Sequence, residues 1–213
     1  TYVLETIISE LNVKSKSICD LGAGEGDFLK MLKQKKLTKN IFAVEPSIKN
    51  CKLLNKNNIK NFQGTIEDYA KKQKKRKFDI LTLMWTLCNT SNCYDVISSV
   101  NKLCKNNGYI VVAESSRILV PFKKPIQMYV SKGNPDIHPF HFSKNSLRNL
   151  LLINNFKPIY INRYLDSDWL LIIAKKQNKI RKKNYKIDNY LKVKKFFLSW
   201  YSYSNQFKDE LKI

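Results

Sequence analysis

The fold of this chain is decided by the stretch Ser17–Ile18–Cys19–Asp20–Leu21–Gly22–Ala23–Gly24–Glu25–Gly26–Asp27–Phe28–Leu29. It predicts a short buried strand that ends in an acidic residue, a tight glycine turn, and a helix over residues 27–35. The glycines permit positive φ and leave out the Cβ atoms that would keep a ligand away from the backbone. The helix points its N-terminal N–H groups and positive dipole end at the turn. The stretch therefore predicts a nucleotide-type pocket at the carboxyl edge of a parallel sheet.

The glycine spacing narrows the class of ligand. A dinucleotide fingerprint reads Gly-x-Gly-x-x-Gly, whereas this turn reads Gly-x-Gly-x-Gly with Asp20 two positions before the first glycine. An anion directly before the turn suits a positively charged ligand better than a pyrophosphate, which disfavours a nicotinamide-dependent dehydrogenase. The pattern resembles motif I of the class I S-adenosylmethionine (SAM)-dependent methyltransferases. The alternative is a glycine turn that merely closes a βα unit.

A carboxylate at the predicted end of the second strand supports that resemblance. Glu45 follows the apolar residues 41–44 and stands 25 positions after Asp20. An acid in this place accepts hydrogen bonds from vicinal ribose hydroxyls. Residues 65–69 resemble motif III of the same family, although acidic residues are also common at a helix N-terminus.

The resemblance covers residues 15–175 and implies SAM as the cofactor. It assigns the methionine and sulfonium end of SAM to the first turn, the ribose to the second, the adenine to residues 66 and 67, and the floor near the methyl group to the fourth strand. The residues implied for the methionine and sulfonium end are Asp20, Gly22, Ala23, Gly24 and Gly26. Glu45 and Pro46 are implied for the ribose, and Ile66 and Glu67 for the adenine, with Asp68 as the alternative acid. Met84 is implied for the floor near the methyl group.

Composition limits the class of protein. A chain of 213 residues with 43% hydrophobic residues is long enough for one domain with an extension. It contains no apolar run of 18 residues, so we expect no transmembrane helix. The five cysteines form no Cys-x-x-Cys pair, which argues against a disulfide framework and a metal site and favours a cytoplasmic protein. The chain begins at Thr1, so an upstream signal stays open.

The net charge of +22 suggests an anionic partner such as nucleic acid. The lysines are spread along the chain, however, and a general compositional bias produces the same pattern. Methyltransferases that act on exocyclic amines of nucleobases carry an Asn/Asp-Pro-Pro-aromatic motif after the fourth strand, and residues 84–89 contain no proline. Nor is Cys88 preceded by proline, as in many pyrimidine C5-methyltransferases. Nucleic acid is therefore a disfavoured partner.

The rest of the chain alternates between predicted strands and helices. This rhythm predicts an α/β, Rossmann-like, doubly wound and mostly parallel sheet, which the resemblance completes to seven strands with a C-terminal antiparallel hairpin strand. A helix over residues 2–11 either packs across the sheet or caps the pocket. A helix over residues 96–104 is expected to end in a left-handed cap at Asn107–Gly108. Residues 1–175 form the predicted methyltransferase domain.

A long segment over residues 115–142 interrupts the alternation and is the predicted substrate lid. It carries His138 and His141, candidates for the base that deprotonates a hydroxyl; alternatively they brace the loop. We predict no metal site here, because no acidic partner stands at a suitable spacing. Arg117, Lys123 and Lys124 either clamp an anionic group of the acceptor or form a solvated rim.

Residues 108–152 most resemble small-molecule O-methyltransferases of the ubiquinone-biosynthesis type and related sugar enzymes. The predicted reaction is methylation of a hydroxyl, on a sugar or polysaccharide precursor or on a quinone-like phenol. An RNA methyltransferase and a non-catalytic SAM-binding module are the alternatives. Residues 176–213 form a basic, aromatic-rich helical extension, which folds back on the domain, forms a dimer contact, or meets an anionic membrane surface or nucleic acid.

Overall fold

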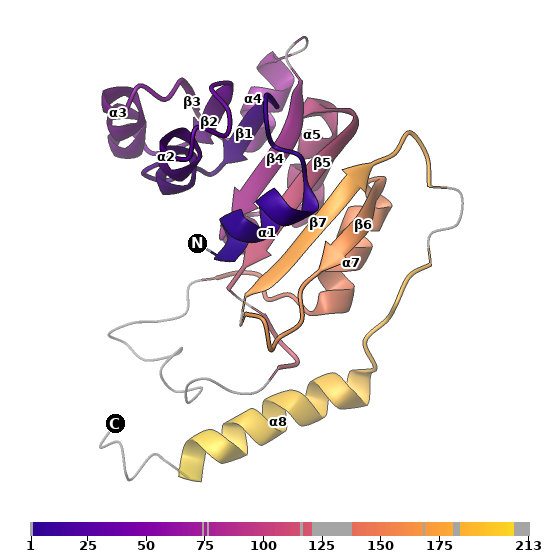
Figure 1. Cartoon of the computed structure of the whole chain (residues 1–213). Helices are drawn as coiled ribbons and strands as arrows, with labels where there is room; N and C mark the ends of the chain where they lie inside the picture. Colours follow the sequence, from indigo (N-terminus) through magenta and orange to yellow (C-terminus); the bar gives the residue numbers. More distant parts are fainter. Residues whose placement is uncertain are drawn as a thin grey trace.

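The chain forms a seven-stranded sheet in the order β3-β2-β1-β4-β5-β7-β6, seen in the computed structural model in Figure 1. The structure describes residues 2–73, 75, 77–115, 117–120, 138–167, 169–180 and 184–206. The strands are β1 (Ile18–Leu21), β2 (Ile41–Glu45), β3 (Asn61–Gln63), β4 (Phe78–Met84), β5 (Cys104–Glu114), β6 (Phe156–Ile161) and β7 (Leu170–Lys176). β1 to β5 pair in parallel, and β7 lies antiparallel between β5 and β6. This is the predicted doubly wound sheet with its C-terminal hairpin.

Helices cover both faces of the sheet. The helices of the described chain are α1 (Tyr2–Glu10), α2 (Asp27–Gln34), α3 (Ile48–Lys56), α4 (Ile66–Lys72), α5 (Cys93–Leu103), α7 (Lys144–Ile153) and α8 (Tyr190–Gln206), with a short 3-10 helix η1 (Leu87–Asn89) after β4. Of these, α8 lies apart from the sheet (Figure 1). In Figure 1, α1 crosses in front of the sheet and α5 lies behind it. In the part of the chain that the structure describes, no helix is both long and apolar enough to span a bilayer.

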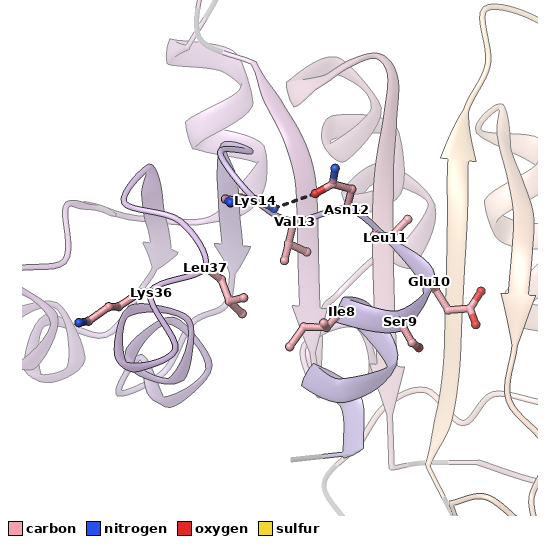
Figure 2. A pocket seen from close by; sticks show the side chains of 9 residues that line it. All are labelled: Ile8, Ser9, Glu10, Leu11, Asn12, Val13, Lys14, Lys36 and Leu37. Carbon is pink, nitrogen blue, oxygen red and sulfur yellow. Dashed lines mark hydrogen bonds between the residues drawn. The ribbon is translucent and has the colours of Figure 1, made fainter.

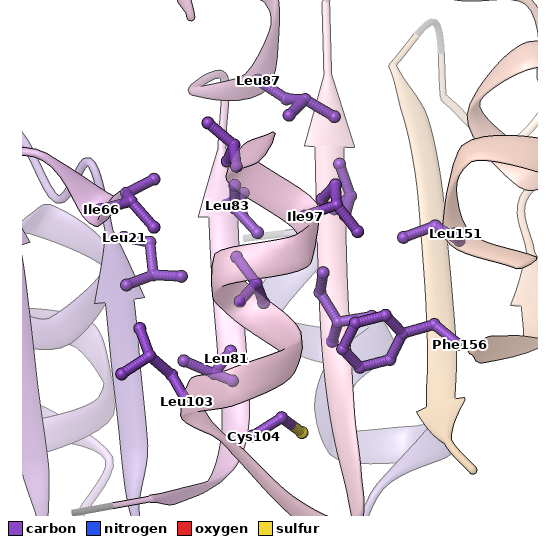
Figure 3. Packing of buried hydrophobic residues seen from close by; sticks show 14 of the residues in the cluster. Leu21, Ile66, Leu81, Leu83, Leu87, Ile97, Leu103, Cys104, Leu151 and Phe156 are labelled. Atoms are coloured by element: carbon purple, nitrogen blue, oxygen red, sulfur yellow. The ribbon is translucent and has the colours of Figure 1, made fainter. Parts of the chain in front are cut away.

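The strand β1 has the central place because it pairs with β2 on one side and β4 on the other. Successive side chains of a strand point to opposite faces, so β1 contributes to both hydrophobic cores. Cys19 and Leu21 join the cluster under α4, α5 and α7, whereas Ile18 joins the cluster under α1, α2 and α3. Figure 3 shows Ile97 and Leu103 of α5 packed over the strands in the first of these clusters.

The N-terminal helix packs on the sheet, which was one of its two expected positions. Its residues Val3, Leu4 and Ile7 are buried in the second cluster together with β5 and β7 residues. Tyr2 and Tyr160 place their hydroxyl oxygens 3.3 Å apart. This contact joins α1 to β6 on the far side of the sheet from β2 and β3.

The predicted cap at Asn107–Gly108 is wrong in its position. α5 ends at Leu103, and Cys104 already pairs with Phe78 as the start of β5. Asn107 does adopt a left-handed φ of 60°, and Gly108 does not. The reason is the irregular register between β4 and β5, which accommodates the left-handed residue as a bulge within the strand and not as a helix end.

Gly26 is fixed by packing. Its φ is +83°, and a Cβ placed there would lie 2.4 Å from Cδ2 of the buried Leu54. Gly24 also has a positive φ, of +55°, but a Cβ there would meet no atom within 4 Å. The two glycines therefore share a backbone requirement and differ in steric surroundings.

We predict that Gly26→Ala lowers the free energy of unfolding by about 3 kcal/mol, because left-handed strain adds to overpacking against Leu54. Gly24→Ala is the matched control and costs about 1 kcal/mol, since it has the strain without the clash. Denaturant titration of both variants measures the difference. Equal losses in the two variants would contradict the packing role of Gly26.

Candidate functional site

A cleft of about 440 Å³ opens at the carboxyl edge of the sheet, where the loops after β1, β2, β3 and β4 meet. This is the edge at which open α/β sheets bind ligands. The residues that line it are Gly22, Val44, Glu45, Pro46, Gly64, Thr65, Ile66, Glu67, Trp85, Thr86, Asn89, Thr90 and Ser91. The predicted residues from the first, second and third loops thus meet around one hollow, although they are spread from Gly22 to Glu67 in the sequence.

The carboxylate of Glu45 organises the centre of this cleft. Its Oε2 accepts a hydrogen bond from the N–H of Gly24 at 2.8 Å. Its Oε1 accepts from the N–H of Ser47 at 3.0 Å and from the side-chain amide of Asn50 at 3.3 Å. Ser47 itself caps α3 by accepting from the N–H of Asn50. Glu45 therefore connects the glycine turn after β1 with the start of α3.

Gly24, whose N–H donates to Glu45, has open space where its Cβ would stand, although it is not among the residues that line the cleft. The open space where its Cβ would stand allows a bound molecule to approach the backbone of the turn. Of the other predicted turn residues, Gly22 lines the cleft, while Ala23 packs against the second core cluster and Gly26 is buried.

Asp20 lies buried at the end of β1, two residues before Gly22, and is only 2% exposed. Thr82 of β4 donates a hydrogen bond to its Oδ1 at 2.6 Å. The pKa of Asp20 is raised to about 7, chiefly by burial, with the hydrogen bond from Thr82 opposing the rise and the nearby Glu45 adding to it. A cation above this carboxyl would favour its charged form. Asp20 is thus a buried acid at the end of β1, and it is not among the residues that line the cleft.

The loop after β3 distinguishes between its two acidic residues. Thr65 caps α4 by accepting from the N–H of Asp68, and its hydroxyl donates to the Asp68 carboxylate at 2.8 Å. Asp68 is therefore engaged in the cap, whereas Glu67 and the buried Ile66 line the cleft. This favours Glu67 over Asp68 as the acid that faces a ligand.

The wall after β4 contains residues that the sequence did not single out as a site. Trp85 has a left-handed φ of 54°, an uncommon conformation for a bulky residue, and packs edge-on against Trp169 with ring centroids 4.6 Å apart. Thr86 donates to the backbone oxygen of Leu21 at 2.9 Å. Met84, in contrast, packs against the second core cluster and does not line the cleft.

A buried carboxyl supports this wall from below. Glu114, at the end of β5, is fully buried, and its Oε1 accepts from the N–H of Leu87 at 2.8 Å. Burial raises its pKa to about 7. Glu114 thereby fixes η1, the short helix that presents Asn89 to the cleft.

The two histidines occupy different places. His138 Nδ1 lies 2.7 Å from Oδ1 of Asn89, and the N–H of Phe140 donates to the oxygen of Cys88 at 3.4 Å. His138 is therefore held at the rim of the cleft. His141 is exposed on the same segment and does not line the cleft.

Arg117, the one predicted clamp residue within the described ranges, does not line the cleft. Arg117 donates to the oxygen of Trp169 at 3.3 Å and stacks over Tyr164, with 5.7 Å between the guanidinium carbon and the ring centroid. Burial lowers its pKa. The predicted clamp residues Lys123 and Lys124 lie outside the described residues. In the described ranges, no group of three or more His, Cys, Asp or Glu residues is arranged to hold a metal ion.

A second hollow, of about 580 Å³, lies beside α1 and the end of α2 (Figure 2). Its lining residues are Ile8, Ser9, Glu10, Leu11, Asn12, Val13, Lys14, Lys36 and Leu37. These residues precede β1 or follow α2, so they belong to the amino edge of the sheet. Although this hollow is larger, none of the residues that the motifs single out lies in it, and the smaller cleft is the candidate active site.

The comparisons with known proteins agree with this geometry. A family profile described as a methyltransferase domain matches residues 2–161. The chain belongs to the SAM-dependent methyltransferases of class I, and its cofactor is SAM. No curated protein sequence matches the chain.

Solved structures share the fold at low sequence identity. A SAM-dependent methyltransferase from Mesorhizobium loti superposes with a TM-score of 0.63 at 14% identity, over 83% of this chain and 98% of that one. A Thermotoga maritima protein described as a possible histamine N-methyltransferase gives 0.64 at 18%, over 83% and 88%. A candidate Haloferax volcanii methyltransferase, solved with the Trm112 activator, gives 0.68 at 12%, over 83% and 90%.

The pKa of Asp20 generates a prediction about stability. Between pH 4 and 7 the folded chain keeps a proton that the unfolded chain has released, so the free energy of unfolding falls as the pH rises through this interval. Asp20→Asn removes this contribution and is more stable than the wild type at pH 8, by at most about 4 kcal/mol. The advantage disappears near pH 4. Denaturant titrations across this pH range measure it, and a less stable variant at pH 8 would contradict it.

The Glu45 network generates a prediction about cofactor affinity. Glu45→Gln loses the charge and one acceptor of a carboxylate that holds the turn and faces the cleft. We expect the Kd for SAM to rise about 10- to 100-fold, the effect of one hydrogen bond to a charged group. Glu25→Gln removes the same charge from an exposed residue of the same turn and should leave the Kd within about threefold. Titration calorimetry compares the two, and equal effects would refute the assignment.

Proposed function

We propose that this protein transfers the methyl group of SAM to a hydroxyl of a small-molecule acceptor, with His138 as the base. The observation that carries the proposal is the 2.7 Å contact between His138 Nδ1 and Asn89 Oδ1, because Asn89 itself lines the cofactor cleft. This contact orients the imidazole at the rim, where an acceptor would enter. His141 is exposed and does not line the cleft, so it is assigned no proton transfer.

The cofactor roles proposed for the individual residues follow from the cleft. Glu45 and Pro46 hold the ribose, Ile66 and Glu67 hold the adenine, and the turn Gly22–Gly26 holds the methionine end above Asp20. The support is that these segments surround one cleft, with the open space of Gly24 beside the Glu45 carboxylate. Met84 packs against the second core cluster and does not line the cleft, so it has no direct cofactor contact in this proposal.

SAM supplies a methyl group on a positively charged sulfur, and the residues of this chain position and prepare its acceptor. Asp20 provides negative charge on the sulfonium side of the cleft, and its burial keeps that charge close to the ligand and away from water. In the tautomer whose Nδ1–H donates to Asn89 Oδ1, Nε2 is the basic nitrogen that takes the hydroxyl proton. Positioning supplies much of the acceleration, and a base adds about 10²- to 10⁴-fold.

The acceptor class proposed is a sugar hydroxyl of a polysaccharide precursor or a quinone-like phenol. The support is the histidine at the rim, because methylation of a hydroxyl depends on a general base more strongly than methylation of an amine does. The five cysteines are buried and none of them is in a disulfide, which supports the proposal that the protein works in the cytoplasm, where thiols stay reduced.

The experiment is methyl transfer from radiolabelled SAM to three sets of acceptors: catechols and 4-hydroxybenzoate, nucleotide sugars, and total RNA. We expect label in a hydroxyl compound. His138→Ala should lower kcat by about 10²-fold or more while the Kd for SAM stays within about threefold. His141→Ala, on the same segment, should change kcat by less than about threefold.

The RNA arm separates this proposal from its main alternative. Label in RNA that declines steeply with salt would favour an RNA methyltransferase, to which the net charge of +22 would contribute. Equal activity of His138→Ala and wild type would remove His138 from the reaction. SAM binding without transfer to any of the three sets would favour a non-catalytic SAM-binding module.

A further inference from the structure

The segment after β7 returns along the outer side of α7. We call residues Asn184–Asp188 the strap. Arg148 and Asn149 donate side-chain hydrogen bonds to the backbone oxygens of Asn184 and Lys186, both at 2.7 Å. The N–H of Lys186 donates back to Asn149 at 3.2 Å. The strap is therefore fastened to one helix at successive points.

The end of the strap is fastened at the beginning of α7. Asp188 accepts hydrogen bonds from the Ser143 hydroxyl and, at 2.7 Å, from the Asn145 amide. Ser143 is the N-cap of α7 and follows Phe142, which pairs with Arg117 just after β5. The strap thus delivers α8 to the carboxyl edge of the sheet, and Figure 1 shows α8 on the side where β4 and β5 end.

One face of α8 exposes large apolar side chains. Tyr190, Leu191, Phe197, Leu198 and Tyr201 are 39–72% exposed. At 100° per residue these five side chains fall within an arc of about 120° on the helix. Ile187 of the strap, 88% exposed, directly precedes them. An exposed apolar face of this kind marks an interaction surface.

A stripe of α8 next to the exposed face is sheltered. Val193, Phe196 and Trp200 are half-buried, and Ser204 is buried, and their spacing of three or four residues places them along one stripe. The centres of the sheltered stripe and of the exposed face lie about 120° apart on the helix, and Tyr203, which is 42% exposed, lies on the other side of the stripe.

Positive charge accompanies the exposed face. α8 contains Lys192, Lys194 and Lys195 and no acidic residue. Lys194 falls within the apolar arc, and the other two lie on its polar side. The preceding segment 175–186 has seven basic residues and no acidic one. The surface that this face contacts must therefore be anionic.

We propose that α8 binds the surface of an anionic lipid bilayer, with its exposed face in the headgroup region and its lysines at the lipid phosphates. A helix of 17 residues, about 25 Å long, with aromatic and leucine residues on one side and lysines beside them, has the composition of an interfacial helix. The strap then holds the carboxyl edge of the sheet toward the bilayer. This inference does not rest on the acceptor proposed above.

The other two partners fit the same face less well. Nucleic acid is bound by aromatic rings that stack on bases, and Leu191, Leu198 and Ile187 cannot stack. A second copy of the chain would bring two lysine-bearing faces and two chains of charge +22 together, which is unfavourable. Aliphatic side chains with lysines beside them are matched by acyl chains under anionic headgroups.

The experiment is co-sedimentation of the full chain with vesicles. We expect binding to phosphatidylcholine vesicles that contain about 30% phosphatidylserine and at least tenfold weaker binding to pure phosphatidylcholine. Leu191→Glu with Leu198→Glu should reduce binding at least tenfold. Ser199→Glu with Gln206→Glu adds the same charge to the polar side of the same helix and should reduce binding less than threefold. SAM titration confirms that each variant has a folded domain.

Four results would overturn the proposal. The first two are absence of vesicle binding by the wild type and equal binding by the two double variants. The third is tighter binding of a single-stranded RNA oligonucleotide than of the vesicles through the same face. The fourth is a dimer in sedimentation equilibrium that only Leu191→Glu with Leu198→Glu dissociates. Residual vesicle binding at about 0.5 M NaCl supports apolar insertion, because charge attraction alone is screened there.

Discussion

The carboxylate of Glu45 is the constraint on which the candidate site depends. It accepts hydrogen bonds from the turn after β1 and from the start of α3, so two loops from neighbouring strands share one acceptor. A carboxylate has enough lone pairs to hold both loops and still face the cleft. The glycine turn is therefore held open by a charged group, and its shape does not rely on the turn residues alone.

The same edge of the sheet concentrates buried acids that oppose stability. Asp20 and Glu114 both lie at the ends of central strands, and burial raises the pKa of each to about 7. Thr82 donates a hydrogen bond to Asp20, and Leu87 and Cys88 donate to Glu114. A fold selected for stability alone would place apolar residues there. The cost is consistent with a site in which a cationic ligand offsets the buried charge.

The C-terminal extension connects to this site through α7. The strap pairs with the outer side of α7, while the inner side of α7 packs Leu147 and Leu151 into the sheet. One helix thus joins the hydrophobic core to the extension. Because the strap ends at the N-cap of α7, α8 and the histidine segment lie at the same edge of the sheet. Any surface that α8 contacts therefore lies on the same edge of the sheet as the cleft.

The sequence by itself determined the order of elements, the parallel sheet and the acids at the ends of β1 and β2, because these depend on local patterns of apolar residues, glycines and turns. It also predicted Glu67 or Asp68 as the adenine-side acid, and the structure favours Glu67, because Asp68 is engaged in the cap of α4. The left-handed Trp85, the Asn89 contact of His138 and the strap along α7 were decided by tertiary structure. Each depends on segments that are distant in sequence and meet only when the strands pair, so no local pattern encodes them. The misplaced cap at Asn107 has the same origin, since pairing of Cys104 with Phe78 ended α5 earlier than its own sequence predicted.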